Sequence, residues 1–214
     1  MISKIKEILL KKAPLIVASL LDPATEEEIN LLRLIVGNDI PQDLIDLYSF
    51  TKGQDPKQAA NFAYGVAFLS VNKTIEIIQS IGRDTDEIEL NYVDSEIDKS
   101  FTFAKTRIPI ADDCASCLIC VDIKPSENGN FGQVILIDYE NGVAFKLADS
   151  ISEYVSNFHN DLCNGMYSLS EDALEDGVQW LVPDREIDPI NWFNSSKWQH
   201  INVALSALGG RNGR

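Results

Sequence analysis

The chain has 214 residues, of which 45% are hydrophobic and 24% charged, a composition typical of a globular domain with a sizeable core. It carries 33 acidic residues against 18 lysines and arginines, which gives a formal net charge of −15 at pH 7. Because proteins bind nucleic acid and anionic lipid mainly through cations, this charge argues against both partners and favours a basic protein or a cationic ligand.

Residues 1–20 are predicted to form an N-terminal amphipathic helix. Lysines precede an apolar run over 13–21, as in a signal peptide, but Glu7 and the helical spacing of the apolar residues beside it favour a helix. No apolar stretch approaches the ~18 residues that a membrane-spanning helix needs. The expected location is therefore the cytoplasm.

Three helices are predicted next. Thr25 with Glu28 forms a capping box that opens the first helix, which Gly37 ends. Pro41 suits the first turn of the second helix, because its missing N–H would have no partner there. A short buried strand over 65–69 then precedes a third helix over 72–81.

Residues 83–99 are strongly acidic. The segment reads either as a solvated loop or exposed hairpin, or as a docking surface for a cationic protein. Its carboxylates are those of Asp84, Asp86, Glu87, Glu89, Asp94, Glu96 and Asp98.

The second half of the chain is rich in strand signals. Four β-branched or apolar runs, with Asn-Gly turn signals around the last two, predict strands that pair antiparallel; the runs cover 106–111, 117–123, 133–138 and 143–147. Ser150 with Glu153 predicts a capped helix that continues to Leu162. The expected fold class is α+β, with a mainly antiparallel sheet flanked by helices.

The chain is expected to form one domain over 21–165 with a C-terminal extension over 166–208 and a frayed tail over 209–214. All three tryptophans, Trp180, Trp192 and Trp198, lie in the extension. Their apolar area is too large to leave in water, so we expect the extension to pack against the body and to end in a helix.

Few residues form a pattern that could carry chemistry. The spacing of Cys114, Cys117 and Cys120 resembles part of an iron–sulfur motif, but a strand of small buried thiols explains it better, and no metal or other cofactor is expected. His159 and Cys163 can touch at i, i+4, without an oxyanion-hole candidate beside them. Carboxylates at or near strand ends can serve as acid and base or hold a cation, although they more often cap turns; these are Asp112, Asp113, Asp122 and Asp138.

Seven phrases, in order, resemble the SUKH superfamily, which is named partly for the fungal cell-wall synthesis regulators Smi and Knr. Each phrase alone is weak, and the ordered set over about 20–162 is specific. Ala115-Ser116 stands where the family usually has a Gly with Asp or Asn. The phrases are 23–29, 40–48, 66–69, 107–113, 118–123, 132–140 and 147–155.

The resemblance implies a non-enzymatic protein-binding module without a shared catalytic site. Bacterial members look like immunity proteins that neutralise a polymorphic or contact-dependent toxin, and an acidic chain suits a basic toxin domain. The alternative is a regulatory scaffold of the Smi/Knr type, and a more remote one is a hydrolase with an unrecognised site. Expected partner contacts are the carboxylates of 84–98, those at the strand ends (Asp112, Asp113, Asp122 and Asp138) and Tyr139.

Overall fold

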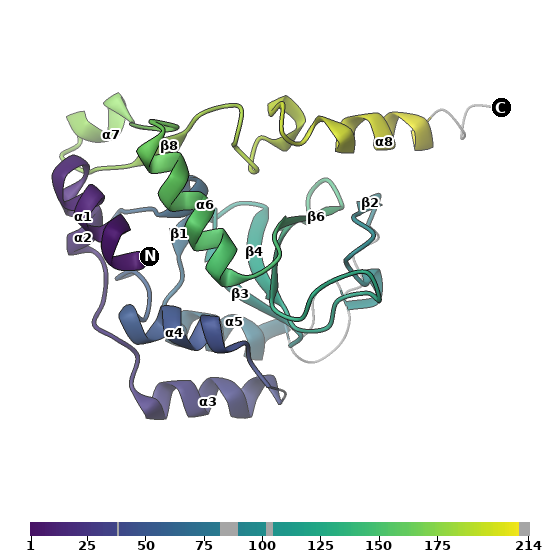
Figure 1. The fold of residues 1–214 in the computed structure, drawn as a ribbon, viewed down its shortest axis with the longest axis horizontal. Helices are drawn as coiled ribbons and strands as arrows, with labels where there is room; N and C mark the ends of the chain where they lie inside the picture. The colour runs from purple at the N-terminus through teal and green to yellow at the C-terminus, as the bar shows by residue number, and fades with distance from the viewer. Residues whose placement is uncertain (38, 82–89, 102–104, 210–214) are drawn as a thin grey trace.

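Six strands form one sheet in the order β1-β3-β4-β5-β6-β2 (Figure 1). The computed structural model describes residues 1–37, 39–81, 90–101 and 105–209. Neighbouring strands pair antiparallel except for the edge strand β2, which runs parallel to β6. The strands are β1 (Ala67–Phe68), β2 (Tyr92–Val93), β3 (Arg107–Asp112), β4 (Cys117–Asp122), β5 (Gln133–Asp138) and β6 (Val143–Ala148).

The helices lie mostly on one face of this sheet (Figure 1). α5 packs on β3, α6 packs on β5 and β6, and α1, α3 and α4 pack on these two helices. The predicted α+β fold with a mainly antiparallel sheet is therefore confirmed. The helices are α1 (Ile2–Lys12), α2 (Pro14–Ala18), α3 (Glu26–Val36), α4 (Gln42–Phe50), α5 (Val71–Ile81), α6 (Ile151–Cys163), α7 (Glu171–Glu175) and α8 (Gln199–Gly209).

The two central strands are buried on both faces. Every residue of β4 and β5 is buried, and because side chains alternate along a strand, each strand supplies apolar groups to both sides. Ile119 and Leu136 belong to the main core beneath the helices. Cys120 and Ile135, which face each other across the strands, belong to a second cluster on the opposite face.

The acidic segment covers this second face. Ile97 is 6% exposed and packs in the second cluster, with Leu90 and Val93 against it. The interpretation of 83–99 as a solvated loop or exposed hairpin is therefore wrong for its described part. Apolar residues placed between the acidic ones attach the segment to the sheet, and β2 pairs with β6 rather than with a hairpin partner.

Three local predictions need correction. The single N-terminal helix is two helices, because the chain leaves helical geometry at Ala13, immediately before Pro14. The strand predicted over 65–69 is reduced to β1, since a 3-10 turn, η1 (Ala63–Gly65), precedes it. At α6 the Ser150 hydroxyl caps the helix as predicted, but Glu153 accepts the N–H of Asp149 rather than that of Ser150.

The C-terminal extension packs on the body. It forms a hairpin of β7 (Tyr167–Leu169) and β8 (Leu181–Pro183), the short 3-10 helix η3 (Trp192–Asn194) and α8. The side chain of Asn61, fully buried, bonds both backbone groups of Leu181: its Nδ2 donates to the carbonyl at 2.7 Å and its Oδ1 accepts the N–H at 2.8 Å. Asn61 therefore pairs with β8 as a neighbouring strand would.

Replacing Asn61→Ala should lower the free energy of unfolding by about 2–4 kcal/mol, because two buried backbone groups lose their partner and each costs roughly 1–3 kcal/mol. Urea unfolding measures the change. The control Asn164→Ala, at the exposed end of α6, should stay within about 0.5 kcal/mol of the parent. Equal effects of the two substitutions would contradict the assignment of Asn61 as the residue that docks the extension.

Candidate functional site

The described part of the acidic segment presents fewer free carboxylates than its sequence suggests. Asp84, Asp86, Glu87 and Glu89 lie outside the described residues. The described members, Asp94, Glu96 and Asp98, are all half-buried.

Asp94 and Glu96 bind their own sheet. Asp94 accepts the hydroxyl of Tyr92 at 2.6 Å and the backbone N–H of Lys146 at 2.8 Å. Glu96 accepts the Lys146 ammonium at 2.9 Å, and this hydrogen bond, with a second from Ser95, lowers the pKa of Glu96. These carboxylates therefore hold the segment on the second face of the sheet, which limits what they can offer a partner.

Asp98 is committed to the same loop. Its carboxylate accepts the backbone N–H of Ser100 at 2.9 Å, a bond that lowers the pKa of Asp98. The carbonyl of Asp98 accepts the Arg107 guanidinium at 2.9 Å. Both groups of Asp98 thus stabilise the end of the segment.

Asp122 is an internal group and not a surface acid. Its side chain is 0% exposed and forms an ion pair with Arg107, whose side chain is 2% exposed. Gln133 donates to Asp122 at 2.9 Å and also to the carbonyl of Glu96 at 2.8 Å. This polar row therefore joins β3, β4 and β5 to the acidic segment above them.

Burial dominates the electrostatics of this ion pair. Desolvation raises the pKa of the Asp122 carboxyl and lowers that of the Arg107 guanidinium, and the attraction between the two charges opposes both shifts. A partner cannot reach Asp122 without opening the network. Asp122, which was expected to contact a partner, is therefore not at the surface in this structure.

Asp138 is also internal. It is 2% exposed, and one of its oxygens, Oδ2, accepts the indole N–H of Trp192 at 3.0 Å and the amide of Asn141 at 2.8 Å. Asp138 thus fixes the C-terminal extension to the end of β5. Its place in the structure is that of a docking group for the chain's own tail.

Asp112, the last residue of β3, and Asp113, which follows it, lie where the turn to β4 begins. Each carboxylate accepts backbone N–H groups of that turn: Asp112 that of Cys114 at 2.7 Å, and Asp113 those of Ala115 and Cys117 at 2.9 Å. Cys114 adopts a left-handed conformation, with φ of 61°. The two carboxylates thus shape the turn and are half-buried, like those of Asp94, Glu96 and Asp98.

Tyr139 lies against this turn. Its hydroxyl donates to the carbonyl of Ala115, and its N–H donates to the carbonyl of Ser116 at 3.0 Å. Burial, followed by the charges of Asp112 and Asp113, raises the pKa of Tyr139. The structure therefore brings together three of the predicted contact residues, which come from two separate turns.

Glu140 is a surface residue of the same place that sequence reasoning missed. It follows Tyr139 directly and is exposed. Its signal in the sequence is the Glu-Asn-Gly turn, which predicts a connection between strands and also places an acidic residue at the surface. We call Asp112, Asp113, Tyr139 and Glu140 the strand-end surface. Among the described ion pairs, none involves the three carboxylates of this surface.

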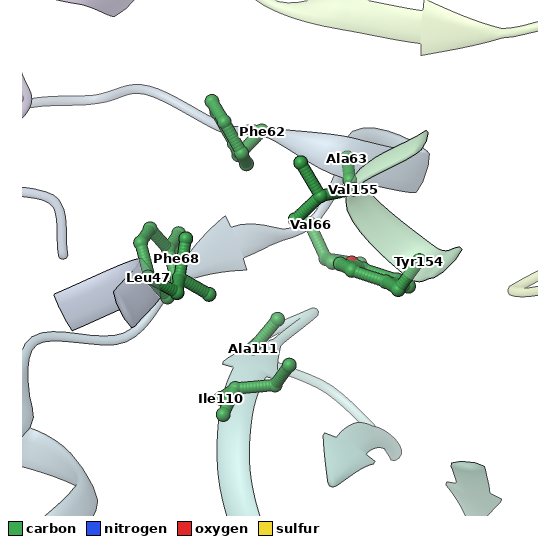
Figure 2. Close-up of a pocket in the computed structure, with 9 residues that line it drawn as sticks. All are labelled: Leu47, Phe62, Ala63, Val66, Phe68, Ile110, Ala111, Tyr154 and Val155. Carbon is green, nitrogen blue, oxygen red and sulfur yellow. The ribbon is translucent and has the colours of Figure 1, made fainter. Parts of the chain in front are cut away.

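The enclosed cavity of the core offers no catalytic site. Figure 2 shows it between side chains of α4, β1, β3, α6 and the residues in and beside η1, among them Phe62, Phe68 and Tyr154. Its volume is about 10 Å³ and its surface is wholly apolar. A void of this size is at most about that of one water molecule and has no polar partner for it, so we read it as a packing defect.

The cysteine and histidine side chains do not come together as a metal-binding group within the described residues. Cys117 and Cys120 are buried on opposite faces of the sheet, as the strand pattern predicts, whereas Cys114 is exposed and not a buried thiol. Cys163 Sγ lies 3.8 Å from His159 Nε2 on the exposed side of α6. Within the described residues, no group of three or more His, Cys, Asp or Glu side chains is placed to hold a metal ion.

Replacing Asp122→Ala should lower the free energy of unfolding by about 3–5 kcal/mol, because it leaves the Arg107 charge buried without its partner. Chemical denaturation at neutral pH measures this. The matched control is Asp149→Ala, which removes an exposed carboxylate paired with Lys146 at 2.9 Å and should cost less than about 1 kcal/mol. A similar small loss for both variants would show that the polar row is not a structural element.

Thiol labelling tests the two-sided burial of β4. In the native protein a disulfide reagent should titrate Cys163 and Cys114, the exposed thiols, and reach Cys117 and Cys120 only after unfolding. Cys114 should react slowly, since burial and the neighbouring carboxylates raise its pKa, while desolvation raises that of Cys120 to about 12. The variants Cys114→Ser and Cys163→Ser assign the two phases. Fast labelling of all four thiols would refute the assignment.

Comparisons with known proteins agree with this architecture. No curated protein matches the chain, and no helix in the described part is long and apolar enough to cross a membrane. A protein-family model, that of the SMI1 / KNR4 family (SUKH-1), matches residues 23–157. This range covers more than half of the chain and runs from the turn before α3 to the middle of α6. The chain therefore belongs to the SMI1 / KNR4 family, SUKH-1, of the SUKH superfamily.

Proposed function

We propose that this chain is an immunity protein, which binds a basic bacterial toxin domain one to one and neutralises it by covering the toxin's cationic groove. The observation that carries the proposal is the strand-end surface. There Asp112 and Asp113 lie beside Tyr139 and Glu140 follows it in the chain, without a basic partner for the three carboxylates among the described ion pairs, on a family member with a net charge of −15.

Charge complementarity gives this surface its role. A negative patch on a strongly negative protein speeds the encounter with a positive partner and disfavours acidic rivals. The surface is also preorganised, because Asp112 and Asp113 are held by the backbone of their own turn and Tyr139 braces it. Little conformational entropy is then lost when a partner docks.

The proposed action is non-enzymatic and takes place in the cytoplasm. The SMI1 / KNR4 family is generally non-catalytic, and the apolar core cavity offers no group for acid–base or nucleophilic work. Inhibition by occlusion requires only that the complex outlives the toxin's encounter with its substrate. Affinity and residence time, rather than turnover, are the quantities that matter.

A regulatory scaffold of the Smi/Knr type is the second candidate. It is supported by the C-terminal extension, which lies outside the family match and exposes large apolar side chains, among them Leu174, Val182 and Phe193, which are 41–50% exposed. Such groups suit weaker contacts with several partners. This role predicts binding without protection from a toxin.

Co-expression tests the proposal. The proposal predicts that a basic toxin domain is encoded beside this chain's gene; that domain is expressed in a sensitive host with and without the chain, and growth is measured. Calorimetry then gives the stoichiometry and the salt dependence of the dissociation constant. Immunity predicts restored growth and a one-to-one complex that weakens as salt rises. A bound toxin that still kills, or no complex at all, would contradict it.

A charge-neutral double variant locates the interface. Asp112→Asn with Asp113→Asn keeps side-chain oxygens for the turn but removes two charges, and should weaken toxin binding at least ~10-fold, or about 1.4 kcal/mol. The matched control is Glu26→Gln with Glu27→Gln, two exposed carboxylates on α3, which lies far from β8 in Figure 1. Equal losses would assign the effect to net charge alone.

A further inference from the structure

A surface pocket of about 290 Å³ lies where the strand-end surface meets the C-terminal extension. Asp113 and the residues of η1 form one side, which belongs to the range that the family model matches. The other side comes from residues beyond that range. The lining residues are Tyr64, Gly65, Val66 and Asp113 from the matched range, and Trp180, Leu181, Val182, Pro183, Asp188, Ile190 and Asn191 from the extension.

The two sides are fixed to each other. Asn61 bonds both backbone groups of Leu181, and the hydroxyl of Tyr167, on β7, accepts the N–H of Tyr64 at 3.0 Å. Gly65 has φ of +76°, and a Cβ there would lie 3.0 Å from the ring of Pro183. The pocket is thus a preformed junction and not a gap between independent segments.

Two carboxylates and no basic side chain line this pocket. A carboxylate offers about four acceptor positions. Asp188 uses three of them on Ile190 and Asn191, and the backbone N–H bonds of Asp113 all go to its Oδ1. Acceptor capacity therefore remains on both residues, and the two negative charges have no cation beside them in the lining.

Apart from the amide of Asn191, the rest of the lining is aromatic or apolar. Trp180 is half-buried, and Val66 and Ile190 add aliphatic surface. An arginine side chain matches this combination: its guanidinium is planar, weakly hydrated and able to stack on an aromatic ring while it donates to carboxylates. A lysine ammonium is a compact, strongly hydrated charge and gains less from such walls.

We propose that this pocket receives an arginine side chain from a basic protein partner. The inference rests on the proposed function, since it names the interaction by which a basic toxin domain would bind beside the strand-end surface. A divalent cation fits the pocket less well, because it prefers six or more oxygen ligands and two carboxylates are present, most of whose oxygens serve the local turns. The extension then decides which basic partner is accepted.

The test uses the full-length protein labelled with ¹⁵N and the probe acetyl-Ala-Arg-Ala-amide, followed by NMR. The reference peptide has citrulline in place of arginine, which keeps the shape and removes the charge. We expect saturable shifts at the Trp180 indole N–H and at the amides of Asp113 and Asn191 with the arginine peptide only. Trp180→Phe assigns the indole signal. Equal shifts with both peptides, or none with either, would overturn the proposal.

Matched variants separate the pocket from general electrostatics. Asp188→Asn and Asp113→Asn should each lower the affinity for the arginine peptide about tenfold. The control is Asp184→Asn, an exposed carboxylate of the same loop that does not line the pocket and should change binding less than about twofold. If Asp184→Asn lowers the affinity for the peptide as much as Asp188→Asn does, the attraction is long-range and the pocket is not the binding site of the arginine.

The peptide experiment does not depend on a toxin. Peptide binding that survives while co-expression gives no protection would refute the immunity role and leave the arginine pocket standing. Protection without peptide binding would refute the pocket and leave immunity standing. Because each result bears on one claim only, the two failures are distinguishable.

Discussion

The two-sided burial of the central strands is the constraint on which the rest of this structure depends. β4 and β5 place apolar side chains on both faces, so the sheet must be covered twice before it is stable in water. Helices cover one face. The other face is covered by residues 90–97, whose Leu90, Val93 and Ile97 supply the apolar contacts.

This second cover accounts for four of the seven described carboxylates that were expected to contact a partner: those of Asp94, Glu96, Asp98 and Asp122. A segment that is acidic and yet lies on an apolar face needs polar bonds at its edges. Asp94 and Glu96 meet Lys146, while Gln133, in the row with Arg107 and Asp122, donates to the carbonyl of Glu96. Most of the described carboxylates that the sequence suggests as a partner surface thus bond to other groups of the same chain.

The strand-end surface lies where the strands end and the C-terminal extension docks. Asp138 is bonded to Trp192 of the extension, while Asp112, Asp113 and Glu140 stay accessible. Two parts of the chain thus meet there: the range that the family model matches supplies the acidic turn, and the extension supplies most of the aromatic and apolar walls. In the proposed role, the domain would provide attraction to basic proteins and the extension selectivity among them.

Local signals in the sequence determined the fold class, the order of the main helices and of strands β3 to β6, and most of their bounds, but not β2, α7 or the β7–β8 hairpin. The capping box of Thr25, the turns at Asn128-Gly129 and Asn141-Gly142 and the apolar runs of β4 and β5 act between near neighbours, so they can be read from spacing alone. Only the tertiary structure decided which acids are free. Asp122 and Asp113 look alike in sequence. Asp122 is buried and pairs with Arg107, 15 residues away. Among the described ion pairs, none involves Asp113. Burial of a charge depends on groups that folding brings together, and spacing along the chain does not encode them.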